Sequence, residues 1–210
     1  MTIVILLIIV AVYNFFILPW LMHWGATKDE FNRTLPGDEL VVDKDYKNTL
    51  TDTINASPSQ IWPWVVQMGV HKAGFYSYTW LENIFGCKLH NADRIHHEWQ
   101  DTQPGYNEGV CQAAEKKGMP GWIVTIVEPG KAFVWKGKDA DWMMGVYIDS
   151  INENTSRIIT RQQFKMPKRW SFKWIMEKVW FSWAHCIMQR GMIMGIKKRV
   201  ESKLIKERSI

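Results

Sequence analysis

Four side chains near the middle of the chain are suited to proton transfer: Glu82, Asp93, Tyr76 and Tyr78. A carboxyl group serves as a general acid or base near neutral pH only when its surroundings raise its pKa. This chemistry therefore requires that Glu82 or Asp93 be desolvated inside a cavity. No catalytic motif is recognised around them, so the residues alone leave open whether the chain is an enzyme.

Large aromatic side chains crowd the same region, from Ser57 to Gln100. They supply more aromatic surface than two short helices need to cover a sheet, and any single one of them is best explained as core. As a group they suit a mostly apolar pocket with a few placed polar groups. With two arginines that would need an acceptor if buried, the predicted ligand-binding residues are Trp64, Tyr76, Tyr78, Trp80, Trp99, Arg161 and Arg190.

Histidines and cysteines do not form a metal motif in this sequence. His96 and His97 are adjacent, so they point in different directions on a helix or a strand, and no spacing with His90, Glu98 or Cys87 matches a zinc site. No metal and no cofactor is predicted. The three cysteines are widely spaced and odd in number, which predicts reduced, buried thiols in a reducing compartment; they are Cys87, Cys111 and Cys186.

The net charge of +5 raises the question of nucleic acid, but no nucleic-acid motif interleaves with the basic residues. Many of them lie between Lys197 and Arg208, where Glu201 and Glu207 dilute them. A solvated helix end is the first interpretation, and attraction to anionic lipid headgroups is the second.

The apolar run Ile3–Met22 has the length of a membrane span and predicts a transmembrane anchor over residues 1–24, with a cleaved signal peptide as the alternative. Lys28 and Arg33 follow the span, which predicts a single-pass membrane protein with its domain in the cytoplasm. Membrane lipid is then an expected partner. The predicted membrane contacts are Trp20, Trp24, Trp174 and Phe181.

Beyond the anchor, residues 25–46 are predicted to form a linker and residues 47–210 the folded domain. Capping signals at Ser57 and Thr79 predict short helices over Pro58–Met68, kinked at Pro63, and Trp80–Phe85. Turn residues then separate apolar runs typical of an antiparallel meander. The predicted strands are 49–56, 109–113, 122–127, 132–136, 142–151 and 156–164.

A long helix is predicted over Pro167–Glu207, with a possible break at Gly191 or Gly195. One apolar stripe should pack on the sheet; it comprises Phe172, Ile175, Met176, Val179, Trp183, Cys186, Ile187, Ile193 and Met194. Arg190 falls within it. A second stripe lies opposite and should face lipid, another chain or the anchor; it comprises Trp170, Trp174, Phe181, Met188 and Met192.

The order of these elements is that of an α+β helix-grip fold. The runs PSQIWPWVVQMG, AGFYSYTWLEN, NADRIHHEWQ and MGIKKRVE sharpen the match: the chain resembles a membrane-tethered branch of the SRPBCC superfamily, which includes START, Bet v 1-like and polyketide cyclase-like domains. The resemblance implies a cavity between a curved sheet and the last helix, and a hydrophobic ligand. It brings no catalytic residues.

Three functions follow from these patterns. The first is a membrane-anchored module that binds a lipid or another hydrophobic small molecule in the cavity. The second is an enzyme of the cyclase or dehydratase kind, in which Glu82 or Asp93 shares proton transfer with Tyr76 or Tyr78. The third is an interaction protein without a cavity. Arg94 and Arg161, with the two carboxylates, are expected at the rim of any pocket, and the sequence leaves the oligomeric state open.

Overall fold

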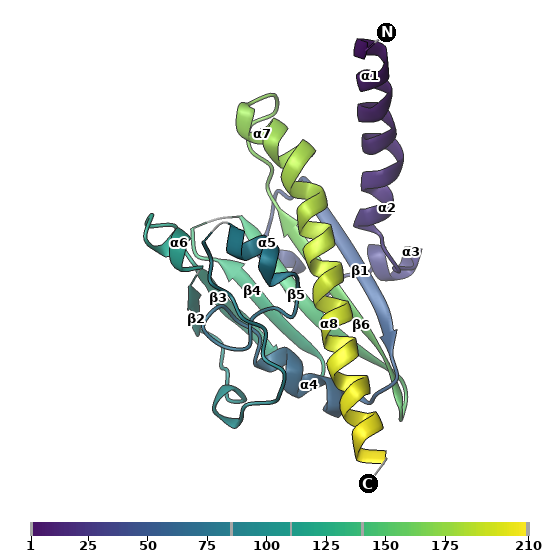
Figure 1. The fold of residues 1–210 in the computed structure, drawn as a ribbon, viewed down its shortest axis with the longest axis vertical. Helices are drawn as coiled ribbons and strands as arrows, with labels where there is room; N and C mark the ends of the chain where they lie inside the picture. Colours follow the sequence, from purple (N-terminus) through teal and green to yellow (C-terminus); the bar gives the residue numbers. More distant parts are fainter. Residues whose placement is uncertain (1, 85, 110, 140, 209–210) are drawn as a thin grey trace.

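A six-stranded antiparallel sheet, in the order β1-β6-β5-β4-β3-β2, forms the centre of the computed structural model, which describes residues 2–84, 86–109, 111–139 and 141–208. Strands β2 to β6 form a meander, and β1 pairs with β6 along its whole length (Figure 1). The predicted α+β class is confirmed. The strands are β1 (Tyr46–Ile54), β2 (Asn107–Gly109), β3 (Trp122–Glu128), β4 (Ala132–Gly137), β5 (Trp142–Asn152) and β6 (Thr155–Phe164).

One strand was misplaced by the sequence pattern. The run 109–113 was expected to be extended, but β2 ends at Gly109 and a one-turn helix, α6 (Gln112–Glu115), follows. Gly109 has a φ of 73°, which ends the strand at this residue. The apolar run was therefore too short to decide between strand and helix.

Two short helices lie between β1 and β2, as the capping signals predict. In α4 (Pro58–Val66) the Ser57 amide donates to the side chain of Gln60 over 2.9 Å, and Pro63 lies inside the helix. The second helix is α5 (Thr79–Ile84). Single-turn elements complete the connections: α3 (Lys28–Asn32), η2 (Asp38–Leu40) and η3 (His97–Trp99).

The C-terminal region is one long helical rod that crosses the sheet (Figure 1). It consists of α7 (Phe172–Met176), a π-helical turn η4 (Glu177–Phe181) and α8 (Ser182–Arg208). The predicted break does not occur, because Gly191 and Gly195 have a packing role instead. A Cβ at Gly195 would lie 2.0 Å from the Tyr76 carbonyl oxygen, and one at Gly191 would lie 2.7 Å from the Tyr78 ring. The two glycines let the segment 76–78 cross directly over the helix.

The two predicted stripes of this helix were partly wrong. Met192, from the outward stripe, is buried, whereas Met194, from the sheet-facing stripe, is 40% exposed. The π-helical turn explains the shift, since it changes the helical phase between α7 and α8. The outward stripe does not face lipid or a partner along its whole length: Phe181, Met188 and Met192 line an internal cavity.

Side chains alternate across the sheet and give it two different faces. We call the side under α8 the helix face and the opposite side the outer face. From β6, Thr160 and Gln162 point to the helix face, where they meet Gln189 of α8. Ile159 and Arg161 point to the outer face, where Ile159 packs with Leu35 in a separate apolar cluster.

The segment predicted as a linker, residues 25–46, packs against the outer face. Leu35, Asp38 and Val41 are buried, and the Trp24 carbonyl and the Gly25 carbonyl accept hydrogen bonds from Thr51 of β1. This segment therefore covers the sheet in the way that a second layer of an α+β domain does.

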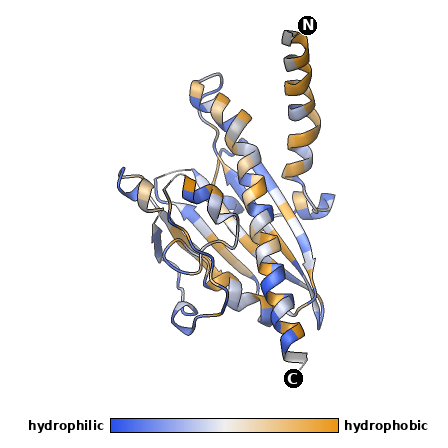
Figure 2. Ribbon diagram, viewed as in Figure 1, coloured by the Kyte–Doolittle hydropathy of each residue, from blue (hydrophilic) through white to orange (hydrophobic). Residues whose placement is uncertain are grey.

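The prediction of a transmembrane anchor is wrong. Within the described ranges, no helix combines the length and the apolarity needed to cross a bilayer. The apolar run comprises α1 (Thr2–Val12), a π-helical turn η1 (Tyr13–Ile17) and α2 (Leu18–Met22). The run is mostly apolar and projects beyond the sheet (Figure 2). The prediction of a single-pass membrane protein is withdrawn with it.

Candidate functional site

A cavity of about 400 Å³ lies between the helix face of the sheet and α8. Strands β3, β5 and β6 supply its floor, α8 its roof, and α5 and the turn before β3 its sides. Nearly all of its wall is apolar. The lining residues are Phe75, Ser77, Leu81, Glu82, Pro120, Gly121, Trp122, Gly137, Lys138, Trp142, Met144, Gln162, Phe181, Trp183, Ala184, His185, Met188, Gln189 and Met192.

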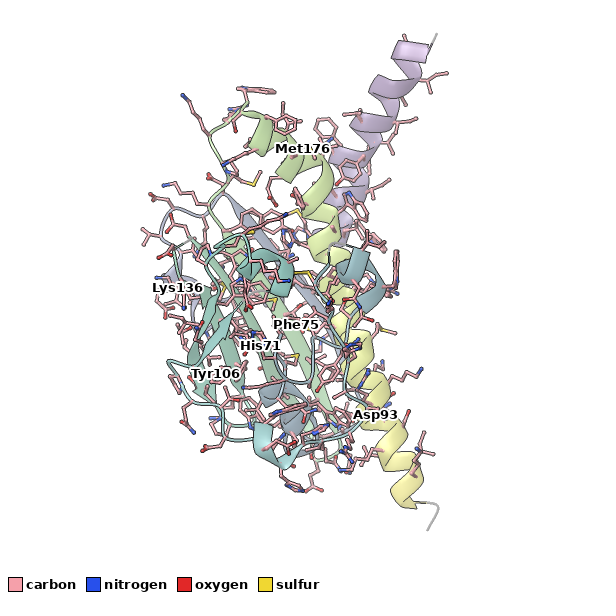
Figure 3. The ribbon with its side chains drawn as sticks, turned by 60° about the vertical axis from the view of Figure 1, so that its left-hand side comes forward. His71, Phe75, Asp93, Tyr106, Lys136 and Met176 are labelled. Carbon is pink, nitrogen blue, oxygen red and sulfur yellow. A yellow bond between two sulfur atoms is a disulfide. The ribbon has the colours of Figure 1, made fainter. Side chains whose placement is uncertain are left out.

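Aromatic rings form one wall of this cavity. Trp122 and Trp142 stack with their ring centroids 4.9 Å apart, and Phe75 tilts against Trp122 at 5.6 Å. Figure 3 shows Phe75 in the interior, between the sheet and the helix. Rings that hold one another in place present a fixed apolar surface, which favours binding of a rigid hydrophobic body.

A polar chain crosses the floor of the cavity. The Thr160 hydroxyl donates to Oε1 of Gln189 over 3.2 Å, and Nε2 of Gln189 donates to Oε1 of Gln162 over 2.7 Å. Nε2 of Gln162 lies 3.5 Å from Nδ1 of His185, whose Nε2 is 3.5 Å from a carboxylate oxygen of Glu177. The Thr160, Gln189 and Gln162 side chains are hydrogen-bonded to one another, so this part of the chain fixes side-chain orientation on the cavity floor.

Glu82 differs from the other polar groups of the cavity. Its Oε2 atom is buried, and no hydrogen-bond partner meets it among the described residues. Burial raises the pKa of its carboxyl from 4.5 to about 7. Glu82 is therefore a partly buried carboxyl at the cavity wall.

A disulfide between Cys87 and Cys111 fastens this side of the cavity. It joins the segment after α5 to the residue before α6, so the helix that carries Leu81 and Glu82 is tied to the far edge of the sheet. The prediction that all three cysteines are reduced is therefore wrong for two of them. Cys186 is free and buried on α8, where the Tyr46 hydroxyl lies 3.4 Å from its sulfur.

The predicted aromatic ligand residues lie outside the described lining of the cavity. Trp64 and Tyr76 are buried in the main core, and the Tyr76 hydroxyl accepts a hydrogen bond from Gln67 over 2.7 Å. Trp80 is 64% exposed, and Trp99 stacks on His96. The Tyr78 ring packs beside Gly191 of α8. Neither tyrosine reaches Glu82's cavity.

The two predicted arginines also lie elsewhere. Arg161 is fully buried on the outer face, where it donates to Oδ2 of Asp38 over 2.7 Å and to three backbone carbonyls of the covering segment. Arg190 packs over the Trp24 ring at 4.8 Å, so it needs no buried acceptor.

The remaining predicted residues are at the surface. Asp93 and Arg94 are exposed, and Figure 3 shows Asp93 beside the C-terminal half of α8, away from Phe75. His96 pairs with Glu98 at 3.1 Å on the surface. The four predicted membrane contacts lie in different places. Trp20 is 62% exposed, and Trp174 packs on Trp170. The Trp24 ring packs against the Arg190 guanidinium, and Phe181 lines the cavity.

Most of the cavity wall was not predicted from the sequence. Trp122, Trp142 and Gln162 come from strands, where the alternation of side chains could have assigned them to one face once the register was known. His185 and Gln189 are spaced four apart on α8, a polar pair within an apolar stripe, and that spacing was the available signal.

No family model and no curated protein matches this sequence. Solved structures show similarity of fold. The KanY protein is 11% identical with a TM-score of 0.47, over 76% of this chain and 99% of that one. A polyketide cyclase-like protein of Corynebacterium glutamicum is 15% identical, with a TM-score of 0.37 over 76% and 95%. A protein of Mycobacterium smegmatis is 15% identical, with a TM-score of 0.40 over 78% and 99%. At this level the similarities carry no information about ligand or reaction, and none supports the membrane-tethered branch in particular.

Proposed function

We propose that this protein binds a hydrophobic small molecule in the cavity between the sheet and α8. The observation that carries this proposal is the cavity itself: about 400 Å³ of space with an apolar and aromatic lining and few polar groups. Such a site is typical of small-molecule binding. The interaction protein without a cavity is disfavoured by the same observation.

Filling the cavity tests this function. N-phenylnaphthylamine, a neutral probe that fluoresces in apolar surroundings, should bind the full-length protein saturably. Met188→Trp places an indole in the cavity and should abolish binding, whereas Met194→Trp, on the exposed side of the same helix, should not. Circular dichroism checks that both variants are folded. Equal binding by both variants, or no binding by the wild type, would contradict the proposal.

A second candidate function is proton transfer on the bound molecule, with Glu82 as the acid or base. Its support is the desolvated carboxyl at the cavity wall, whose pKa of about 7 matches that role. His185 also lines the cavity, and in this proposal its imidazole would have the proton-transfer role that the sequence analysis assigned to Tyr76 or Tyr78.

The two functions differ in what Glu82→Gln does to a natural ligand. The test extracts small molecules from wild-type and Glu82→Gln protein purified from the same cells, and compares them by chromatography and mass spectrometry. An enzyme should yield different molecules from the two proteins, because the variant retains unconverted substrate. A binding protein should yield the same molecule, in a different amount.

A further inference from the structure

The polar groups of the cavity are unequal in what they can offer a ligand. The Gln189 and Gln162 amides donate within the floor, and the Ser77 hydroxyl donates to the Met188 carbonyl over 2.8 Å. Among the described lining residues, the buried side-chain atom left unpaired is an acceptor, Oε2 of Glu82. When Glu82 is ionised, a ligand that completes this site therefore has to donate to its carboxylate.

The charge around Glu82 favours the same kind of ligand. Besides Glu82, the titratable groups that line the cavity are Lys138 and His185. Lys138 is exposed, and His185 is held toward Glu177. Among the described residues no cation is paired with the Glu82 carboxylate, so its negative charge is uncompensated when the group is ionised.

The aromatic wall adds a second preference for a cation. Trp122, Trp142 and Phe75 border the same space. Indole and phenyl faces attract ammonium groups, most strongly where water is excluded. A carboxylic acid ligand would instead bring a second negative charge toward Glu82.

We infer that the cavity selects lipophilic amines: a hydrophobic ring system bearing one protonated amine that donates to the Glu82 carboxylate. This inference rests on the proposed function and specifies its ligand class. A bound ammonium would favour the ionised form of Glu82, so binding near neutral pH should release a proton from that carboxyl.

Three probes that share one ring system test the class. Naphthylethylamine, naphthylethanol and naphthylacetate differ in the polar end only, and the ring system is of a size that the cavity holds. Isothermal titration of the full-length protein at about pH 8 keeps both the carboxylate and the ammonium charged. The amine should bind about tenfold or more tighter than the alcohol, as a charge-assisted hydrogen bond predicts, and the acetate should bind most weakly.

Variants then assign the preference to Glu82. Glu82→Gln should reduce the affinity for the amine to that for the alcohol, and Glu82→Asp should retain the preference. Glu153→Gln, in the exposed turn between β5 and β6, removes the same charge elsewhere and should change nothing. Titration of the amine at about pH 6.5, in two buffers of different ionisation enthalpy, should show proton release from the wild type and none from Glu82→Gln.

The outcomes separate the inference from the proposed function. Equal affinity for amine and alcohol, a preference that survives Glu82→Gln, or tightest binding of the acetate overturns the amine class while leaving a hydrophobic cavity. Failure of all three probes to bind, with N-phenylnaphthylamine bound, also overturns it. Failure of all four probes overturns the proposed function as well.

Discussion

Each side of the sheet holds an ionisable side chain with buried polar atoms, and the surroundings of the two side chains are opposite. On the outer face, Arg161 has every nitrogen engaged: Nε with Thr49, Nη1 with Asp38 and the Arg33 carbonyl, and Nη2 with the carbonyls of Glu30 and Phe31. On the helix face, Glu82 has a buried oxygen with no partner among the described residues and borders an empty space.

This difference distinguishes a structural charge from one for which we propose a function. Burial lowers the pKa of the Arg161 guanidinium, and the Asp38 carboxylate opposes that shift, so the pair fastens the N-terminal segment to the sheet. A saturated buried charge leaves nothing for a ligand to bind. An unsaturated one beside a cavity costs stability in the empty protein and becomes useful when a ligand completes it.

The largest expected change in stability comes from a substitution on the outer face. Asp38→Ala leaves Arg161 buried without its carboxylate, which should cost about 3 to 5 kcal/mol of unfolding free energy. Asp38 also accepts from the Leu35 amide and from Gln163, and these bonds are lost too. Urea denaturation measures the change. Asp43→Ala removes the partner of Lys165 in an exposed pair and should change stability by less than about 1 kcal/mol.

On the helix face, a disulfide contributes stability in addition to side-chain packing. The Cys87–Cys111 disulfide closes a loop with a sequence separation of 24. Replacing both cysteines with Ser should lower the unfolding free energy by about 3 kcal/mol through the entropy of the unfolded chain. Because α5 is released as well, N-phenylnaphthylamine should bind more weakly. Reduced wild-type protein is the matched comparison, and unchanged denaturation curves for both would contradict the assignment.

Adjacent methionines on β5 compare the packing of the two faces directly. Met143 is fully buried on the outer face, whereas Met144 lines the cavity. Met143→Ala leaves a new cavity in a close-packed cluster and should cost about 2 to 5 kcal/mol. Met144→Ala enlarges a space that already exists, so fewer contacts are lost and the cost should be smaller by about 1 kcal/mol or more. Equal costs would indicate that the cavity closes in solution.

Local signals in the sequence were sufficient for most of the elements. Ser57 with Gln60 marked the start of α4, and turn residues separated β3 to β6 at nearly their observed bounds. The signals failed where two structures share one composition. The apolar run from residue 3 to 22 matched a membrane span by length, and no local feature revealed the π-helical turn within it or the one that shifts the phase of α8.

The site depended on information that no single segment carries. Glu82 was a candidate because of its residue type, and the structure places it in the cavity. Arg161 was also a candidate, but its face is decided by strand register and by the segment 28–41, which the sequence pattern treated as a linker. The Cys87–Cys111 pairing likewise follows from tertiary proximity, which the spacing of three cysteines cannot encode.

The smallest expected effect concerns the cost of the unsaturated charge itself. Glu82 titrates near 4.5 when unfolded and near 7 when folded, so both states are protonated in acid and the group has no effect there. Between these values the unfolded state alone ionises, so stability falls as the pH rises through about 7, and it stays lower above that pH. Glu82→Gln should therefore raise the unfolding free energy at about pH 8 by about 1 kcal/mol, after allowance for partial exposure, and leave it unchanged near pH 4. Glu153→Gln should change the unfolding free energy by less than about 0.5 kcal/mol at either pH.

Saturating naphthylethylamine should make the wild type more stable than Glu82→Gln at about pH 8, because the ammonium group stabilises the carboxylate of the wild type and meets no charge in the variant. A variant no more stable than the wild type in the absence of amine would show that Glu82 is solvated, and the contrast between the two faces would then disappear.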